Sequence, residues 1–216
     1  MHFEILVEDL SGKKMLEILM PKILGNGNTY RIHSYKGCGK IPRNLKTAQD
    51  ACSRILLEQL PKLLSGYGKT YQFDLSQASI IVVCDLDDRN KEFFLNELRT
   101  ILDNCHPAPV TRFCLAIEEG EAWLLGDFPA IRQAYPHTKD AVLHKYRNDN
   151  ICGTWELLAD AVYPKGCSRL KRKGYQVIGA EKSRWAEKIT PYMDIDKNKS
   201  PSFNEMKVKI RELSAK

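Results

Sequence analysis

The chain has 216 residues, of which 43% are hydrophobic and 28% are charged, so it can bury a core and is not disordered throughout. This length fits one globular domain, or one domain with a helical appendage. The formal net charge of +6 is compatible with a polyanionic partner but does not identify one.

Strand and helix patterns alternate along the first two thirds of the chain. Alternating or continuous apolar runs predict strands at Phe3–Glu8, residues 29–35, Ser79–Asp85 and Thr111–Ile117. Apolar positions at helical spacing predict helices over residues 11–24, 47–64, 90–103 and 119–126. Ser11 is expected to cap the first helix, and Ser65–Gly66 to end the second. Strands that alternate with helices indicate an α/β fold with a mostly parallel sheet flanked by helices.

The strand patterns fade after about residue 135. Helices are predicted over residues 154–162, 181–190 and 203–213, in a stretch that is richer in basic side chains. We therefore expect an α/β domain over residues 1–135 and a helical C-terminal extension over residues 136–216 that packs on it.

Cysteine usage and hydropathy indicate the compartment. The seven cysteines include no C-x-x-C pair, which argues against a zinc ribbon or a disulfide framework and favours a reducing environment. The first residues lack the pattern of a signal peptide, and no apolar run approaches the roughly 20 residues of a membrane helix. We expect a cytoplasmic protein without a membrane partner.

Acidic residues follow three of the predicted strands. Glu8 closes the first strand, Asp85 and Asp87 close the third, and Glu118 follows the fourth. Because ligands of open α/β sheets bind at the carboxyl ends of the strands, we expect these carboxylates to meet at one rim. Like charges at one rim raise one another's pKa unless a cation neutralises them. Oxygen ligands without a spaced set of His or Cys favour Mg²⁺ or Mn²⁺ as that cation.

The spacing of Asp85 and Asp87 predicts that both side chains face one metal site, since side chains along a strand repeat every two residues. The alternative is that acids at strand ends begin loops or cap helices. Asp88 would then cap the helix that follows it, and Glu119 would favour the N-terminus of its own helix. For the three strand-end acids taken together, convergence at one rim favours the metal site.

A strand ending in Glu, then a helix, and a later strand ending in D-x-D resemble the Toprim domain of topoisomerases, bacterial primases and overcoming-lysogenization-defect (OLD) nucleases. The resemblance implies that Glu8 is the general acid or base, that Asp85 and Asp87 coordinate Mg²⁺, and that residues 1–135 form the catalytic domain. A small branch related to the OLD nucleases is similar in three further segments: AIEEGEAWLLGD (Ala116–Asp127), TWELLADA (Thr154–Ala161) and SPSF (Ser200–Phe203). Members of this branch resemble partners of a separately encoded ATPase, in gene clusters suspected of phage defence.

The sequence departs from the Toprim pattern at one position. Toprim domains usually carry Gly directly after the Glu, whereas Asp9 follows Glu8 here, so the turn is built differently and Asp9 is a candidate extra ligand. OLD-type nucleases resemble two-metal enzymes, which implies a second cluster of acids, for which the candidates are Glu118, Glu119 and Glu121. Trp123, on the same helix as Glu121, is expected to be a core residue.

Basic residues are the expected contacts to a phosphodiester backbone. The loop Lys36–Lys40 (KGCGK) places two Lys beside two Gly, where the backbone can approach a phosphate, although a flexible surface loop is the simpler interpretation. Lys182 and Arg184 are candidates for stabilising charge in the transition state, with Lys182 expected to be catalytic. Charge runs are more often solvated faces, but the densest one would bind a nucleic-acid backbone; it comprises Arg169, Lys171, Arg172 and Lys173.

The sequence therefore predicts a Mg²⁺-dependent endonuclease, in which water activated by the metal and a carboxylate attacks a phosphodiester. The alternative is a non-catalytic Toprim-like subunit that docks on an ATPase or on nucleic acid. Asp9 in place of the usual Gly favours this alternative, and the retained Asp85 and Asp87 argue against it. A haloacid-type phosphatase fits less well, because its D-x-D motif closes the first strand, which here ends in Glu8. Whether the substrate is DNA or RNA, whether one or two metals bind, and whether the protein forms an oligomer stay open.

Overall fold

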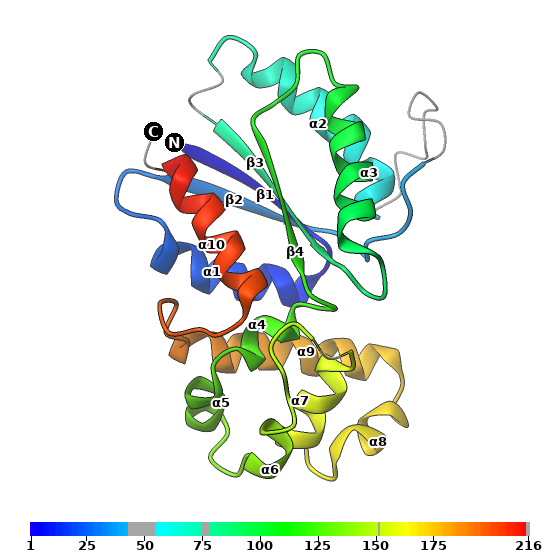
Figure 1. The fold of residues 1–216 in the computed structure, drawn as a ribbon, viewed down its shortest axis with the longest axis vertical. Helices are drawn as coiled ribbons and strands as arrows, with labels where there is room; N and C mark the ends of the chain where they lie inside the picture. The colour runs from blue at the N-terminus through cyan, green and yellow to red at the C-terminus, as the bar shows by residue number, and fades with distance from the viewer. Residues whose placement is uncertain (43–54, 75–77, 151, 215–216) are drawn as a thin grey trace.

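The computed structural model describes residues 1–42, 55–74, 78–150 and 152–214. In these residues four parallel strands form one sheet in the order β2-β1-β3-β4 (Figure 1). The strands are β1 (His2–Val7), β2 (Thr29–Ser34), β3 (Ala78–Asp85) and β4 (Thr111–Ala116). The α/β class and the parallel sheet predicted from the sequence are thus confirmed.

Both faces of the sheet are covered, because alternate side chains of β1, β3 and β4 enter two separate apolar cores. In β3, Ile81 and Val83 join the core shared with α1 (Leu10–Ile23). Ile80, Val82 and Cys84 join the core shared with α2 (Leu56–Tyr71) and α3 (Lys91–Asp103). A strand that is buried on both faces has a continuous apolar sequence, which explains the unbroken run at the centre of β3.

The chain reverses its direction across the sheet between β1 and β3. From β1 it crosses through α1 to β2 on one side, and then through α2 to β3 on the other side of β1. Helix α3 continues in the second direction to β4, so α1 covers one face while α2 and α3 cover the other. In such sheets a crevice opens at the carboxyl ends of the two strands that flank the reversal, here β1 and β3.

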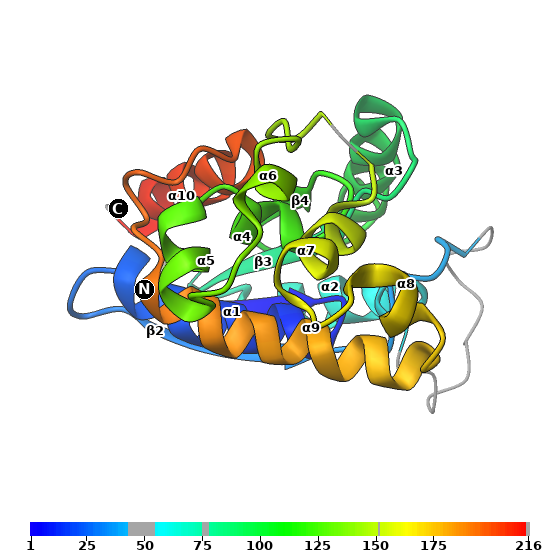
Figure 2. The same cartoon turned by 90° about the horizontal axis from the view of Figure 1, so that it is seen from below.

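The helical half of the chain begins directly after β4 with a series of short helices. They are α4 (Glu121–Leu125), α5 (Phe128–Ala134), α6 (Asp140–Leu143), α7 (Thr154–Val162), α8 (Gly166–Lys171), α9 (Tyr175–Ile189) and the 3-10 turn η1 (Thr190–Tyr192). These helices lie beyond the carboxyl ends of the strands, with α9 alongside α1 (Figures 1 and 2). Residues on both sides of position 135 contribute to the core under α1, so the two halves pack as one body.

The last helix returns to the sheet. Helix α10 (Pro201–Ser214) packs beside β4, where Lys209 Nζ donates to the carbonyl oxygen of Phe113 at 2.8 Å. At its start, Ser202 Oγ accepts a hydrogen bond at 3.0 Å from Nε1 of Trp123, which is buried, so the core role predicted for Trp123 is confirmed. None of the helices in the described residues is long and apolar enough to cross a membrane.

The first two helices differ from their predicted boundaries. Helix α2 continues through Ser65–Gly66 without a break, so the predicted end is wrong. Gly68, inside α2, lets the helix approach a neighbouring loop, since a Cβ there would lie 1.9 Å from the carbonyl oxygen of Pro107. Helix α1 is capped by Asp9 rather than by Ser11. The predicted helical residues 47–54 lie outside the described residues.

Candidate active site at the carboxyl ends of the strands

Glu8 and Asp85 meet at the crevice between β1 and β3. Glu8 is the first residue after β1, and Asp85 is the last residue of the strand beside it. The backbone N–H of Asp85 donates a hydrogen bond to Oε2 of Glu8 at 3.2 Å. The structure therefore brings together two of the predicted site residues that lie 77 positions apart in the sequence.

Asp9 builds the turn between β1 and α1. Its Oδ1 accepts a hydrogen bond from the backbone N–H of Gly12 at 2.7 Å, and its Oδ2 accepts one from Ser11 Oγ at 2.6 Å. Gly12, in the first turn of α1, lets the helix start close to β1, because a Cβ at Gly12 would lie 2.6 Å from Cγ2 of Val7. Both carboxylate oxygens of Asp9 are thus engaged in capping α1, which leaves less capacity for the extra metal ligand considered from the sequence.

Lys182 of α9 places its ammonium group among the acids of the site. Its Nζ lies 3.1 Å from Oε2 of Glu121 and 3.4 Å from Oε2 of Glu119. The side chains of Lys182 and Glu121 are only 15% and 3% exposed, so this ion pair is largely withdrawn from water. Burial lowers the pKa of Lys182, but the surrounding carboxylates outweigh burial and raise the pKa, so the ammonium stays charged. Arg184, the other candidate on this helix, is exposed and pairs with Glu181 instead.

The surroundings of the carboxyl groups in the site disfavour their ionised forms, which raises their pKa. Burial is the main cause of a raised pKa at Glu8, Asp85 and Glu121, and the charge of Glu8 raises the pKa of Asp85 further. Burial also raises the pKa of Glu119 to about 7, although Lys182 opposes the shift. One buried lysine therefore does not balance these acids, and a further cation would favour their ionised forms.

Asp87 lies beyond the end of β3 and does not have an extended backbone conformation. Its backbone N–H donates to the carbonyl oxygen of Glu118 at 2.9 Å, and both residues adopt left-handed backbone conformations, with φ of 51° and 54°. Because β3 ends at Asp85, the two-residue alternation that predicted a shared orientation of Asp85 and Asp87 does not extend to Asp87. Asp87 is instead exposed, and its Oδ2 lies 3.5 Å from Nη2 of Arg89.

Glu118 attaches the helical half of the chain to this rim. Its two carboxylate oxygens accept hydrogen bonds from the backbone N–H groups of Gly153 at 2.7 Å and Thr154 at 2.8 Å, where α7 begins. A carboxylate at this position satisfies free N–H groups and interacts favourably with the helix dipole. Both oxygens of this predicted second-metal ligand are therefore engaged at the N-terminus of α7. The helix cap considered for Asp88 is supplied by Asn90, whose side chain accepts from the backbone N–H of Phe93.

The basic loop after β2 lies against Glu8. The backbone N–H of Gly37 donates to the carbonyl oxygen of Glu8 at 3.0 Å, and hydrogen bonds from the buried Cys38 lower the pKa of the Glu8 carboxyl against the larger effect of burial. Lys36 and Lys40, on either side of this contact, are exposed. The two lysines predicted as phosphate contacts therefore belong to a loop that touches the candidate active site.

Arg89 was not predicted from the sequence as a site residue. Its Nη2 lies 3.4 Å from the carbonyl oxygen of Gly39, and its guanidinium stacks over the ring of Phe94 at 4.5 Å from the centroid. Together with its contact to Asp87, this places a cation at the rim beside the acids. Its position directly after the acidic end of β3 is the signal that would have identified it.

The residue types at the crevice suit a divalent cation, but their side chains are not arranged around one position. Hard oxygen ligands from Glu8, Asp85 and Glu121 line one small hollow at the crevice. Within the part of the chain that the structure describes, no three His, Cys, Asp or Glu side chains lie close enough together to hold a metal ion. Binding Mg²⁺ would therefore require side chains to turn toward a shared position near Lys182.

The predicted basic patch lies on α8 and the turn after it, and all four of its side chains are exposed: Arg169, Lys171, Arg172 and Lys173. Lys171 pairs with Glu156 at 3.1 Å, and its Nζ lies 5.3 Å from the ring centroid of Trp155. Lys173 Nζ lies 5.7 Å from the ring centroid of Tyr163. Cations interleaved with aromatic rings are typical of surfaces that bind single-stranded nucleic acid.

Comparison with known proteins gives one match. A family model described as a domain of unknown function, DUF4276, matches residues 7–211, from the end of β1 into α10. The match therefore includes both the acids at the strand ends and the helical half. No curated protein and no solved structure matches the chain.

Proposed function

We propose that the chain, which belongs to the DUF4276 family, is a Mg²⁺- or Mn²⁺-dependent nuclease that hydrolyses phosphodiester bonds of nucleic acid. The proposal rests on Glu8 and Asp85, which lie side by side at the reversal of the sheet, where the backbone N–H of Asp85 donates a 3.2 Å hydrogen bond to the carboxylate of Glu8. Ligands of doubly wound sheets bind in this crevice. The buried Glu121 lines the same hollow, which adds a third carboxylate.

Glu8, Asp85 and Glu121 are the residues that would hold the ion. A bound Mg²⁺ would supply positive charge to phosphoryl oxygens and increase the acidity of a bound water. The raised pKa of all three carboxyls supports this assignment, because burial disfavours their ionised forms and a bound cation would favour them.

The side chains of the protein would orient the substrate and move the proton. The carboxyl group of Glu8, held by the N–H of Asp85, would accept a proton from the attacking water, which is the acid or base role that the resemblance to Toprim domains implies. Lys182 would stabilise negative charge that develops on the phosphate. Lys36, Lys40 and Arg89 at the rim, with the basic patch on α8, would bind the polyanionic backbone.

The resemblance to the OLD-related branch implies that the nuclease acts with a partner protein. A separately encoded ATPase, acting with this chain in phage defence, would explain a nuclease that is inactive or weak by itself. We expect cleavage to increase when such an ATPase is added to the assay.

The test is cleavage of plasmid, linear duplex, single-stranded DNA and tRNA with Mg²⁺, with Mn²⁺ and with EDTA. Asp85→Asn keeps the size of the side chain and removes its charge, so it should reduce the cleavage rate by about 100-fold or more. Asp88→Asn is the matched control, because Asp88 is exposed and only three positions further along the chain. Equal rates for the two variants, or cleavage that persists in EDTA, would contradict the proposal.

A non-catalytic interaction subunit is the second candidate. It is favoured by Lys182, which already compensates part of the acidic charge, and by Glu118, whose oxygens are both engaged in capping. For this candidate, calorimetry would show no binding of Mn²⁺, no substrate would be cut with or without the ATPase, and the ATPase would still bind.

A further inference from the structure

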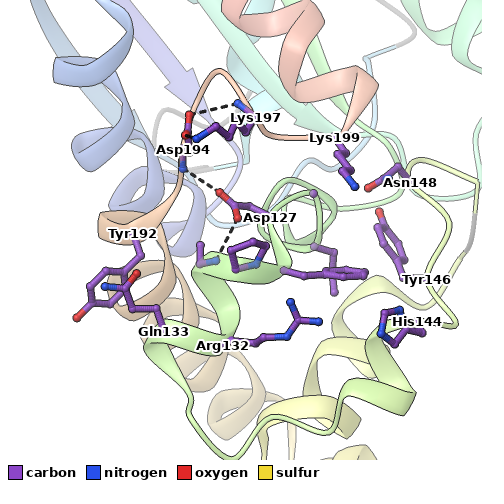
Figure 3. A pocket seen from close by; sticks show the side chains of 15 residues that line it. Asp127, Arg132, Gln133, His144, Tyr146, Asn148, Tyr192, Asp194, Lys197 and Lys199 are labelled. Atoms are coloured by element: carbon purple, nitrogen blue, oxygen red, sulfur yellow. Dashed lines mark hydrogen bonds and ion pairs between the residues drawn. The ribbon is translucent and has the colours of Figure 1, made fainter.

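A second cavity, of about 610 Å³, lies in the helical half of the chain (Figure 3). Its walls come from α5, from the segment that follows α6, and from the loop between η1 and α10. Glu8, Asp85 and Glu121 line a different hollow, so the cavity is separate from the candidate active site. Its volume falls in the range of pockets that enclose small organic ligands.

The acids of the cavity are used to build its wall. Asp127 is buried, and its two oxygens accept hydrogen bonds from the backbone N–H groups of Ala130 at 3.1 Å and Asp194 at 2.8 Å. The carboxylate of Asp194 pairs with Lys197 Nζ at 3.1 Å. Neither carboxylate therefore needs a cationic ligand in the cavity.

Polar groups elsewhere in the wall lack partners. Nζ of Lys199 forms no hydrogen bond or ion pair with any residue that the structure describes, although the backbone N–H of Lys199 is held by Gly126. Oδ1 of Asn148 is buried and has no hydrogen-bond partner among the described residues. In Figure 3 the ends of these two side chains point toward one another. They form an adjacent donor and acceptor at the edge of the cavity.

A second cation reaches the cavity from α5. Arg132 lines the wall and uses Nε to donate to Oδ1 of Asp140 at 2.8 Å. A guanidinium group carries five donors in a fixed plane, so its terminal nitrogens remain available to a phosphate or carboxylate.

Most of the remaining wall is apolar or aromatic. Phe128 lies on its wall and meets the ring of His144 edge to face, with 6.2 Å between the ring centroids. Leu125, Pro129 and Tyr192 extend this surface. A flat ring bound here would replace water against aromatic and apolar groups.

We propose that this cavity binds a nucleotide, with the edge of its base at Asn148 and Lys199 and its phosphate at Arg132. An adjacent acceptor and donor match the edge of a nucleobase, which presents a donor and an acceptor side by side. A planar base lies against the wall at Phe128, and the guanidinium of Arg132 binds the phosphate through charge-assisted hydrogen bonds. The proposal does not depend on nuclease activity, since no residue of the acidic crevice takes part.

The same chemistry is offered by a free nucleotide and by the terminal nucleotide of a strand. Isothermal titration calorimetry of the full chain in EDTA would therefore compare AMP, CMP, GMP and UMP with a 5′-phosphorylated tetranucleotide. Ribose 5-phosphate and inorganic phosphate lack the base and serve as the reference ligands. We expect at least one nucleotide or the tetranucleotide to bind at one site per chain, at least about tenfold more tightly than ribose 5-phosphate.

Three variants test the assigned contacts. Arg132→Gln, Lys199→Gln and Asn148→Ala should each weaken nucleotide binding about tenfold or more, with melting temperatures that confirm folding. Lys62→Gln, at an exposed lysine of α2, should bind as the wild type does. Binding that persists in Asp85→Asn places the site in the cavity rather than in the crevice. The proposal is overturned if no nucleotide or tetranucleotide binds, if ribose 5-phosphate binds as tightly, or if the three variants match Lys62→Gln.

Discussion

Replacing Lys182 with methionine removes a buried ammonium group and keeps a side chain of similar length. In the folded protein its Nζ lies 3.1 Å from Glu121 and 3.4 Å from Glu119, and the side chain of Glu121 is only 3% exposed. Removing one partner of a buried ion pair costs about 3–5 kcal/mol, because the other charge stays buried without a counterion. We therefore expect Lys182→Met to lower the free energy of unfolding by about 3–5 kcal/mol at pH 8.

The loss should be smaller in mild acid. The pKa of Glu119 is raised to about 7 by burial, and burial also raises the pKa of Glu121, so both carboxyls bind protons readily once the lysine is absent. A loss of 1 kcal/mol lowers the melting temperature of a chain of this length by about 2–4 °C. The expected decrease is therefore about 6–20 °C at pH 8 and clearly less at pH 6, measured by circular dichroism in EDTA.

Lys91→Met is the matched control. Lys91 pairs with Glu205 at 2.9 Å, but the two side chains are 42% and 41% exposed, so solvent screens the pair. Such surface pairs contribute about 0–1 kcal/mol. If Lys182→Met and Lys91→Met lose the same stability at pH 8, the ammonium of Lys182 is not buried among the acids in solution, and its assignment to the site is wrong.

Three further predictions concern stability around the site. Glu119→Gln should flatten the pH dependence of the melting temperature in EDTA: the folded-state pKa of about 7 exceeds the ordinary 4.5, so this carboxyl lowers stability as pH rises through that interval. Parallel curves for variant and wild type would contradict this. Gly12→Ala should cost about 1–3 kcal/mol in urea unfolding, because the new Cβ would lie 2.6 Å from Cγ2 of Val7, and an unchanged midpoint would show that the turn adapts. Glu118→Ala should cost about 1–3 kcal/mol and speed amide exchange in the first turn of α7, whose N–H groups lose their acceptor; unchanged exchange would exclude the capping role.

Features that depend on the period of side chains within one element could be predicted from the sequence. The apolar run of β3 indicated a strand buried on both faces, and both faces are buried. The acids after β1 and β3 could be placed at one rim, because parallel strands end on the same side of a sheet. Trp123 was predicted as a core residue because large aromatic side chains are mostly buried, and it is buried.

The partners of those residues were decided by the tertiary structure. The sequence pattern within one strand does not predict that β3 lies beside β1. This strand order puts the N–H of Asp85 within hydrogen-bond distance of Glu8. Lys182 reaches Glu121 because α9 packs against both α1 and α4. Asp9 and Glu118 were candidate ligands because each follows a predicted strand, but helix N-termini placed by the fold engage their oxygens.

The sequence by itself therefore determined the fold class, the elements of the sheet and the positions of acids at the strand ends, since each follows from side-chain periodicity over a few residues. The strand order, the ion pair of Lys182 and the cavity at Asn148 and Lys199 depend on segments that are distant in the sequence. Such contacts are set by how the two faces of the sheet and the helices pack together, and this packing has no signature within a single element.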